Sequence, residues 1–412
     1  MENFDQMLEK YAEVIVKVGL NLQPGQRLFI AAEMKTAPLV RAVTQKAYQN
    51  GAPLVNVFWA DEELTKIRYE YAPRDSFEEV IAWYFEGIMQ DAKSGHAYLS
   101  VTGTDPDLLK PYDPELVAAS LKARAKHFKP ASEYISNGGT QWLVVCPPTP
   151  KWAAKVFPEL STADAEEKLW DVFNGLCRLD NDDPVATWRT HLDDLKKRHS
   201  FLTDKQFESL HFYGPGTDLT IGMPDKHVWK GGGSKTIGGV DFTANIPTEE
   251  VFCMPHKYKV NGIVSATKPL NYYGNLIENF SLTFKDGKVV DLKAEKGEDT
   301  LRKMIETDEN ASYLGEVALV PHFSPISESG LIFFNTLYDE NAACHLALGS
   351  AYRENIQGGV EMKEDELDAH GVNDSLIHVD FMIGSDQVDI DGIAPDGSVL
   401  PLIRAGRWAF DV

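Results

Sequence analysis

The chain has 412 residues, of which 43% are hydrophobic, and this length and composition predict a soluble protein with two domains. It contains 62 acidic and 40 basic residues, which gives a formal net charge of −22 at pH 7. Because the acidic residues are spread along the chain, this charge argues against nucleic acid or an anionic membrane as a partner. A neutral or cationic small substrate fits better.

The cysteines and the start of the chain bear on the compartment. Four cysteines lie far apart without a C-x-x-C spacing, and the first residues show no basic region followed by an apolar stretch. No apolar run approaches the roughly 18 residues that span a bilayer. We therefore expect a reducing, cytoplasmic location, without a membrane span or anchor.

The first half of the chain alternates between strand and helix patterns. Helical spacing covers 4–18, an apolar strand pattern covers 25–33, a second helix over 36–52 is closed by Gly51, and a strand follows at 53–60. This order predicts a βαβ unit with parallel strands. The pattern continues in strands at 96–103 and 141–150 and helices at 82–95, 114–128, 151–158, 161–177 and 184–198. We expect an α/β fold whose N-terminal domain, residues 1–200, is a doubly wound, Rossmann-like scaffold.

The second half is dominated by short strand patterns separated by Gly, Asn and Asp turns. Residues 282–292 read as a hairpin with an Asp-Gly turn. Helices are predicted from about Gly297 and over 340–349, and further strands at 211–224, 280–297, 317–320, 330–337 and 377–384. The C-terminal domain, residues 201–412, is therefore predicted to be mostly β (α+β).

Two features, a glycine-rich segment and the βαβ unit, suggest nucleotide binding at first sight. The segment 230–235, KGGGSK, lacks the spacing and the preceding apolar strand of a P-loop. The turn after the strand at 25–33 reads Met34-Lys35-Thr36, without the G-x-G-x-x-G that lets a pyrophosphate approach the backbone. We expect a loop at the rim of a site in the first case and a domain without cofactor in the second.

The last third of the chain carries side chains that bind metals. His378 and Asp380 are two residues apart in a β-branched apolar run, so period-2 alternation places both on one face of a strand. Imidazole and carboxylate without thiolate suit an open catalytic site better than a closed structural zinc site. The candidate residues of this region are Glu316, Glu340, His345, Tyr352, His378 and Asp380.

Each candidate also has a structural interpretation. Glu340 alone would be a solvated helix residue, and Glu316 alone a charge at a turn. His345 lies in an apolar stretch, where it is either a ligand or a core histidine bonded to a backbone carbonyl. Further upstream, either Glu249 or Glu250 can share a face with the following apolar residues, and the spacing does not decide between them.

Four segments, at 239–252, 314–320, 338–352 and 378–385, together resemble the M29 metallopeptidases, the thermophilic aminopeptidase or aminopeptidase T family. The resemblance extends over essentially the whole chain. It selects Glu250 over Glu249 and adds Tyr352 as an active-site residue. Carried over residue by residue, it implies metal ligands at Glu250, Glu316, Glu340, His345, His378 and Asp380.

The resemblance implies an aminopeptidase that forms a homodimer and acts on peptides with a free N-terminus. Four carboxylates and two imidazoles exceed what one open catalytic ion needs, but they suit two divalent ions (Zn, Co, Mn or Mg) about 3.5–4 Å apart. We expect Glu316 to bridge the ions and a metal-activated water to attack the scissile carbonyl. Tyr352 would either bind a metal or donate to the oxyanion.

Two other functions use similar ligands. A dinuclear phosphoesterase would need Arg or Lys side chains to bind phosphate, and only Arg353 and Lys363 occur between Glu316 and Asp380. A non-catalytic, metal-stabilised binding protein would need complete ligation and no opening for substrate. The loops with several glycines at 231–247 favour an opening.

Overall fold

The computed structural model describes residues 4–272 and 274–412. The chain forms two compact units. Unit 1 contains the chain up to Thr190 together with Gly233–Pro247, and unit 2 contains His191–Gly232 and Thr248–Val412. A short segment from the second half of the sequence thus completes the N-terminal unit.

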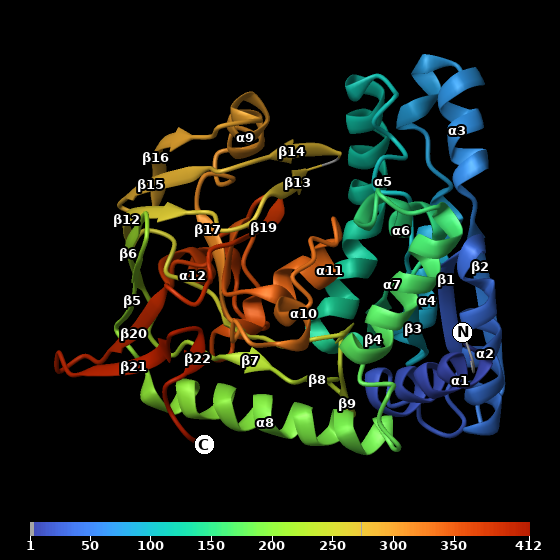
Figure 1. Ribbon diagram of the computed structural model, residues 1–412, viewed down its shortest axis with the longest axis horizontal. Helices are drawn as coiled ribbons and strands as arrows, with labels where there is room; N and C mark the ends of the chain where they lie inside the picture. The colour runs from blue at the N-terminus through green and yellow to red at the C-terminus, as the bar shows by residue number, and fades with distance from the viewer. Residues whose placement is uncertain (1–3, 273) are drawn as a thin grey trace. The chain divides into compact units, whose positions relative to one another are not determined.

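Unit 1 is built on a parallel sheet. Its strands are β1 (Leu28–Glu33), β2 (Val55–Ala60), β3 (Ala97–Val101), β4 (Trp142–Val145) and β10 (Asn245–Ile246). They lie in the order β10-β4-β3-β1-β2, and every neighbouring pair is parallel; β1 and β2 run side by side in Figure 1. The predicted parallel α/β sheet is confirmed, while a Rossmann-like layout beyond this strand order stays a prediction.

The helices of unit 1 follow the strands as the sequence pattern predicts. Ser161 begins one of them, because its hydroxyl oxygen accepts a hydrogen bond from the backbone N–H of Asp164. The helix after β2 was not predicted, since its apolar residues show little helical periodicity. The helices are α1 (Phe4–Val14), α2 (Ala37–Gln49), α3 (Glu62–Tyr71), α4 (Ala82–Lys93), α5 (Pro114–Tyr134), α6 (Pro150–Val156) and α7 (Thr162–Leu176), and α8 (Pro184–Lys205) continues into unit 2.

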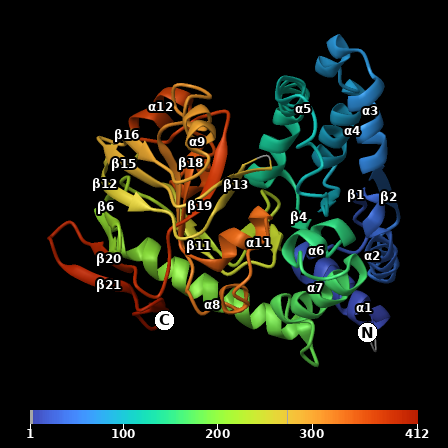
Figure 2. The same ribbon diagram turned by 45° about the horizontal axis from the view of Figure 1, so that its top comes forward.

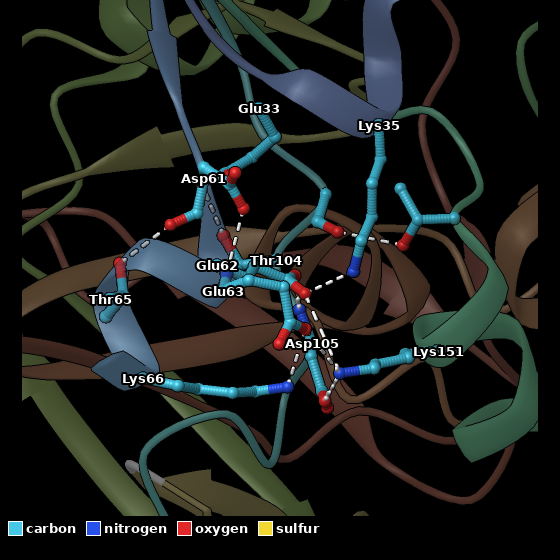
Figure 3. A network of polar contacts seen from close by, with 12 residues as sticks. Glu33, Lys35, Asp61, Glu62, Glu63, Thr65, Lys66, Thr104, Asp105 and Lys151 are labelled. Carbon is cyan, nitrogen blue, oxygen red and sulfur yellow. Dashed lines mark hydrogen bonds and ion pairs between the residues drawn. The ribbon is translucent and has the colours of Figure 1, made fainter. Parts of the chain in front are cut away.

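A network of charged side chains lies where β1, β2 and β3 end (Figure 3). The buried carboxylate of Glu62 accepts a hydrogen bond of 2.7 Å from the backbone N–H of Asp105 and forms an ion pair with Lys35. Lys151 lies 3.5 Å from Asp105 Oδ2 and 3.7 Å from Glu63 Oε1. Each of these carboxylates therefore has a lysine beside it.

Most strands of unit 2 lie in two antiparallel sheets. The larger has the order β16-β15-β12-β6-β5-β20-β21-β22 and the smaller the order β19-β18-β17-β11-β7; β20 and β21 run side by side in Figure 2. The larger sheet consists of β5 (Ser209–Gly214), β6 (Thr217–Gly222), β12 (Val260–Ser265), β15 (Ser281–Lys285), β16 (Lys288–Lys293), β20 (Asp389–Ile393), β21 (Val399–Arg404) and β22 (Arg407–Trp408). The smaller consists of β7 (Lys230–Gly231), β11 (Val251–Cys253), β17 (Leu314–Leu319), β18 (His345–Gly349) and β19 (His378–Met382).

Several predicted elements of unit 2 are confirmed. The β15–β16 hairpin turns at Asp286 and Gly287, which both have positive φ, as the Asp-Gly pair predicts. Apolar residues of both sheets, among them Phe212, Leu282 and Phe381, form one buried core. The remaining elements of unit 2 are β13 (Leu270–Tyr272), β14 (Asn275–Ile277), α9 (Glu298–Ile305), α10 (Pro325–Glu328), α11 (Thr336–Asp339) and α12 (Glu364–Ala369), and two short hairpin strands of unit 1 are β8 (Ser234–Lys235) and β9 (Asp241–Phe242).

The predicted strand over 330–337 is wrong, because this segment is a loop that leads into α11. The carboxylate of Asp339 accepts hydrogen bonds from the backbone N–H groups of Phe333 (2.8 Å) and Asn335 (3.1 Å). These bonds satisfy backbone groups that a strand would pair with its neighbour. The Asp339 carboxylate therefore accepts the backbone hydrogen bonds that a neighbouring strand would otherwise have accepted.

The predicted helix over 340–349 is also wrong. A single 3₁₀ turn, η5 (Glu340–Ala342), is followed by the fully buried strand β18. Short apolar runs that are buried on both faces show neither helical nor strand periodicity, so the sequence pattern could not separate the two.

Within residues 4–272 and 274–412, every helix is too short or too polar to cross a membrane.

Candidate metal centre

The smaller sheet of unit 2 aligns two acidic residues across three strands. Glu316 of β17 and Asp380 of β19 both lie opposite Ala347 of the central strand β18. Residues directly opposite one another in a sheet point to the same face. The small Ala347 side chain, between the two carboxylates, leaves space above the sheet at this point.

Two histidines lie on the same face, because each is two residues from a member of this row. His345 precedes Ala347 in β18, and His378 precedes Asp380 in β19, which confirms the predicted strand and its alternation. His345 Nδ1 lies 3.1 Å from the carbonyl oxygen of Ala343, and His378 Nδ1 lies 2.7 Å from that of Ser350. These contacts fix the tautomer with the proton on Nδ1 and leave Nε2 of each ring as a ligand atom.

The Nε2 atoms face different oxygens of one glutamate. His345 Nε2 lies 3.4 Å from Glu316 Oε1 and 3.3 Å from Glu250 Oε2. His378 Nε2 lies 3.6 Å from Glu316 Oε2 and 3.4 Å from Asp380 Oδ1. The cluster therefore contains two groups of ligand atoms, one of Glu250, Glu316 and His345 and one of Glu316, His378 and Asp380, which share Glu316.

Two other predicted residues, Glu340 and Tyr352, adjoin these groups, and Glu250 is a member of the first group. Glu250 directly precedes β11 and is buried, and Glu340 begins η5. The ring of Tyr352 lies 5.2 Å from that of His378 and 5.9 Å from that of Phe252, between ring centroids. Tyr352 is 40% exposed as a residue, yet burial of its hydroxyl and the nearby carboxylates of Glu316 and Asp380 raise the pKa of this side chain well above its usual value.

Negative charge accumulates in this cluster. Burial raises the pKa of Glu340 well above its usual value, and the carboxylates of Glu250 and Asp380 raise it further. Burial alone would lower the pKa of His378, but Asp380 and Glu316 outweigh it and raise this pKa to about 10. In the same way Glu250 and Glu316 raise the pKa of His345 against the effect of burial. The carboxylates thus hold protons on both imidazoles when no other cation is present.

The donor atoms fit divalent cations. Glu250 Oε2 is buried and makes no hydrogen bond to the described residues, although His345 Nε2 is 3.3 Å away. Among residues 4–272 and 274–412, no lysine or arginine forms an ion pair with the carboxylates of the cluster, which are Glu250, Glu316, Glu340 and Asp380. Carboxylate oxygens and neutral imidazole nitrogens bind Zn, Co and Mn well, and a cation would displace the protons on the imidazoles.

The structure brings all seven predicted residues to one region of unit 2. It also shows a residue that the sequence argument missed, Asn341, whose amide contacts the segments that carry Glu250 and Glu340. Its position directly after Glu340 was the only signal in the sequence. The backbone carbonyls that orient the two histidines could not be identified from residue types.

Comparison with known proteins gives consistent matches. The sequence model of the family described as "Thermophilic metalloprotease (M29)" matches residues 4–408. The chain is 49% identical to "Aminopeptidase 2" of Geobacillus stearothermophilus over 412 residues, and 48% identical to "Aminopeptidase AmpS" of Bacillus subtilis (strain 168) over 410 residues, with 100% of each chain covered. The solved structure "Wild-type AmpT from Thermus thermophilus" superposes with a TM-score of 0.94 at 42% identity, covering 99% of this chain and 100% of that one.

Proposed function

The chain belongs to the M29 family of thermophilic metalloproteases, and on this premise we propose that it is a metal-dependent aminopeptidase that removes N-terminal amino acids from peptides. The observation that carries the proposal is the pair of ligand groups that share Glu316 in unit 2. The relatives are all named aminopeptidases, and these names support cleavage at the N-terminal end of the peptide.

In this proposal six side chains hold two divalent ions. Glu250 and His345 would hold one ion, His378 and Asp380 would hold the other, Glu316 would be the ligand shared by both, and Glu340 would complete the set. When bound, the ions would supply a Lewis acid for the scissile carbonyl and lower the pKa of the attacking water. The ions are drawn from Zn, Co, Mn and Mg, of which Mg is the least suited to imidazole.

The protein's own residues bind and orient the peptide. The excess of carboxylates attracts the cationic α-amino group of a peptide substrate. A substrate with a blocked N-terminus has no such cation. The Tyr352 hydroxyl keeps its proton and can donate a hydrogen bond to the oxygen that becomes negative in the transition state. The ring of Tyr352 packs against those of both Phe252 and His378.

A phosphoesterase is the second candidate for such a ligand set. Phosphate transfer needs cationic side chains on the phosphoryl oxygens. Among the described residues, Arg353 pairs with Glu364 and Lys230 with Glu354, and neither forms an ion pair with the cluster. The charge of the site therefore favours a peptide over a phosphate ester.

We also propose that the protein is a homodimer. The support in unit 1 is a set of exposed large apolar side chains on the edge strand β2 and on α3 and α4, where Trp59 is 45%, Leu64 65% and Trp83 63% exposed. Surfaces of this kind on soluble proteins mark contacts with other chains. Light scattering of the wild type and of a Trp59→Glu, Leu64→Glu variant tests the proposal; a monomeric wild type would refute it.

The function is tested by hydrolysis of a leucine or arginine anilide. The purified protein is dialysed against chelator, and Co, Zn, Mn or Mg is added back separately. We expect activity to be lost, to return with at least one metal, and to be absent on the N-acetylated anilide. If the protein binds two ions but cleaves only a phosphatase substrate, the phosphoesterase replaces the peptidase; if it cleaves neither, the metals are structural.

A further inference from the structure

Asn341 lies between two segments of unit 2 that carry proposed metal ligands. It is 0% exposed and follows Glu340 in η5. Its Oδ1 accepts a hydrogen bond of 2.7 Å from the backbone N–H of Glu249, the residue before Glu250. Its Nδ2 donates to the carbonyl oxygen of Leu337 at 2.9 Å and lies 3.5 Å from Glu340 Oε1. One amide thus joins segments that are 92 residues apart in sequence.

The segment that carries Glu250 depends on such side-chain contacts. Its ladder bonds begin only at Val251, which pairs with Leu319 and Gly231. Just before this strand, His191 Nε2 lies 2.8 Å from the carbonyl oxygen of Thr248, and Asn341 accepts from the amide of Glu249. The backbone that directs the Glu250 side chain is therefore fixed by two side chains rather than by the sheet.

The 3₁₀ turn that carries Asn341 is itself held in place. The hydroxyl of Ser324, a buried residue, donates to the carbonyl oxygen of Asn341 at 3.1 Å. The hydroxyl oxygen of Ser324 in turn accepts a hydrogen bond from the backbone N–H of Ser327 at the start of α10. Asn341 is thus a fixed reference point from which the Glu250 segment is positioned.

Like charges make this contact necessary. Glu250 is buried, Glu340 is partly buried, and the two carboxylates are close enough to interact electrostatically, so that their negative charges repel each other when no cation lies between them. We propose that Asn341 is a positioning residue that holds Glu250 and Glu340 in register at the metal centre and thereby sets its affinity for divalent ions. This inference rests on the proposed function, because it assumes that the cluster binds metal.

The test measures metal affinity directly, independent of activity. Metal-free wild type, Asn341→Ala and Asn341→Asp are titrated with Zn²⁺ or Co²⁺ against a chromogenic chelator, and the thermal stability of each metal-free protein is recorded. Gln141→Ala is the matched control, because Gln141 is a buried, hydrogen-bonded amide of unit 1, which contains none of the proposed ligands. The aspartate variant keeps the size of the side chain and its acceptor for Glu249, but it loses both donor contacts of Nδ2.

We expect the dissociation constant for at least one ion to rise about 10–100-fold in both variants, as for other residues that orient metal ligands, and saturating metal to restore part of kcat. Gln141→Ala should bind metal like the wild type. Wild-type affinity in both Asn341 variants, with only the metal-free stability reduced, would show that Asn341 is merely structural. If Asn341→Ala does not fold, Asn341→Asp alone decides. If the wild type binds no metal, the proposed function itself fails, which is a distinct result.

Discussion

Each unit contains a cluster of acidic side chains, and the two clusters differ in how their charge is compensated. At the ends of β1–β3 in unit 1, Glu62, Glu63 and Asp105 each lie beside a lysine (Figure 3). In unit 2, the ion-pair partners of the acidic cluster around Glu316 among the described residues are the imidazoles of His345 and His378.

This difference distinguishes a structural network from the proposed metal site. A carboxylate with a lysine partner and a backbone donor, such as Glu62, has no electrostatic need for a ligand. Carboxylates that face one another and raise the pKa of neighbouring histidines do need a cation. The carboxyl end of the parallel sheet is a frequent ligand site in α/β proteins, but here lysine–carboxylate pairs occupy it.

The comparison is tested most severely by the same substitution in both clusters. Glu316→Gln should lower bound metal and reduce anilide hydrolysis by more than the roughly 100-fold typical of outer-shell residues, because it removes the proposed bridge. Glu62→Gln, which changes a glutamate of similar burial in unit 1, should leave kcat and metal content unchanged. Steady-state kinetics and elemental analysis measure both.

His378→Ala should act like Glu316→Gln, while His96→Ala in unit 1 should change neither activity nor metal content, since His96 pairs with Asp91. A His378→Ala protein with full activity and full metal content would show that the site is assigned wrongly.

Metal should stabilise the acidic cluster and leave the compensated one unaffected. Relative to chelator-treated protein, metal at 100 times its dissociation constant adds about 2.7 kcal/mol to the free energy of unfolding, or roughly 5–10 °C in Tm for a unit of about 200 residues. Differential scanning calorimetry with and without metal measures the shift. Hydrogen exchange should localise the added protection to β17, β18 and β19. Equal protection in β1–β3 would contradict the distinction drawn between the clusters.

One substitution can remove the main cationic partner of the buried carboxylate in the network of unit 1. Lys35→Met removes the lysine nearest to Glu62 and should lower the free energy of unfolding by about 1–2 kcal/mol, less than a fully buried broken pair costs, because Lys35 is 32% exposed and Lys151 remains nearby. The double variant Lys35→Met, Glu62→Met should regain most of this loss. Urea unfolding measures the stability of each variant. If the double variant is no more stable than Lys35→Met, the loss of stability does not come from leaving the Glu62 carboxylate without its partner.

The smallest expected effect concerns His199, which has lysines nearby instead of the carboxylates that surround His345 and His378. Burial, with Lys230 and Lys196 nearby, lowers the pKa of His199 to about 4. Because the unfolded chain takes up this proton near pH 6.5 and the folded one does not, stability is fully present above pH 6.5 and is lost as the pH falls toward 4. His199→Gln should remove this loss, by less than about 1 kcal/mol because the site is partly exposed. Urea midpoints of both proteins at pH 7 and pH 5 test it; an equal decrease in both would exclude His199 as the cause.

Residue types and spacing in the sequence were enough to predict much of this protein. The alternation of apolar runs predicted the parallel sheet of unit 1, because strand and helix periods are local properties. The Asp286-Gly287 pair predicted its hairpin for the same reason. The spacing of His378 and Asp380 predicted their common face, since side chains alternate along every strand.

The tertiary structure decided what depends on neighbours distant in sequence. Only the register of β17, β18 and β19 places Ala347 between Glu316 and Asp380. Whether residues 340–349 form helix or strand depended on burial between neighbouring strands, which local pattern does not encode. Charge compensation also depends on residues distant in sequence. Glu62 and Glu316 are the same residue type, and only the folded chain brings a lysine to the first and histidines to the second.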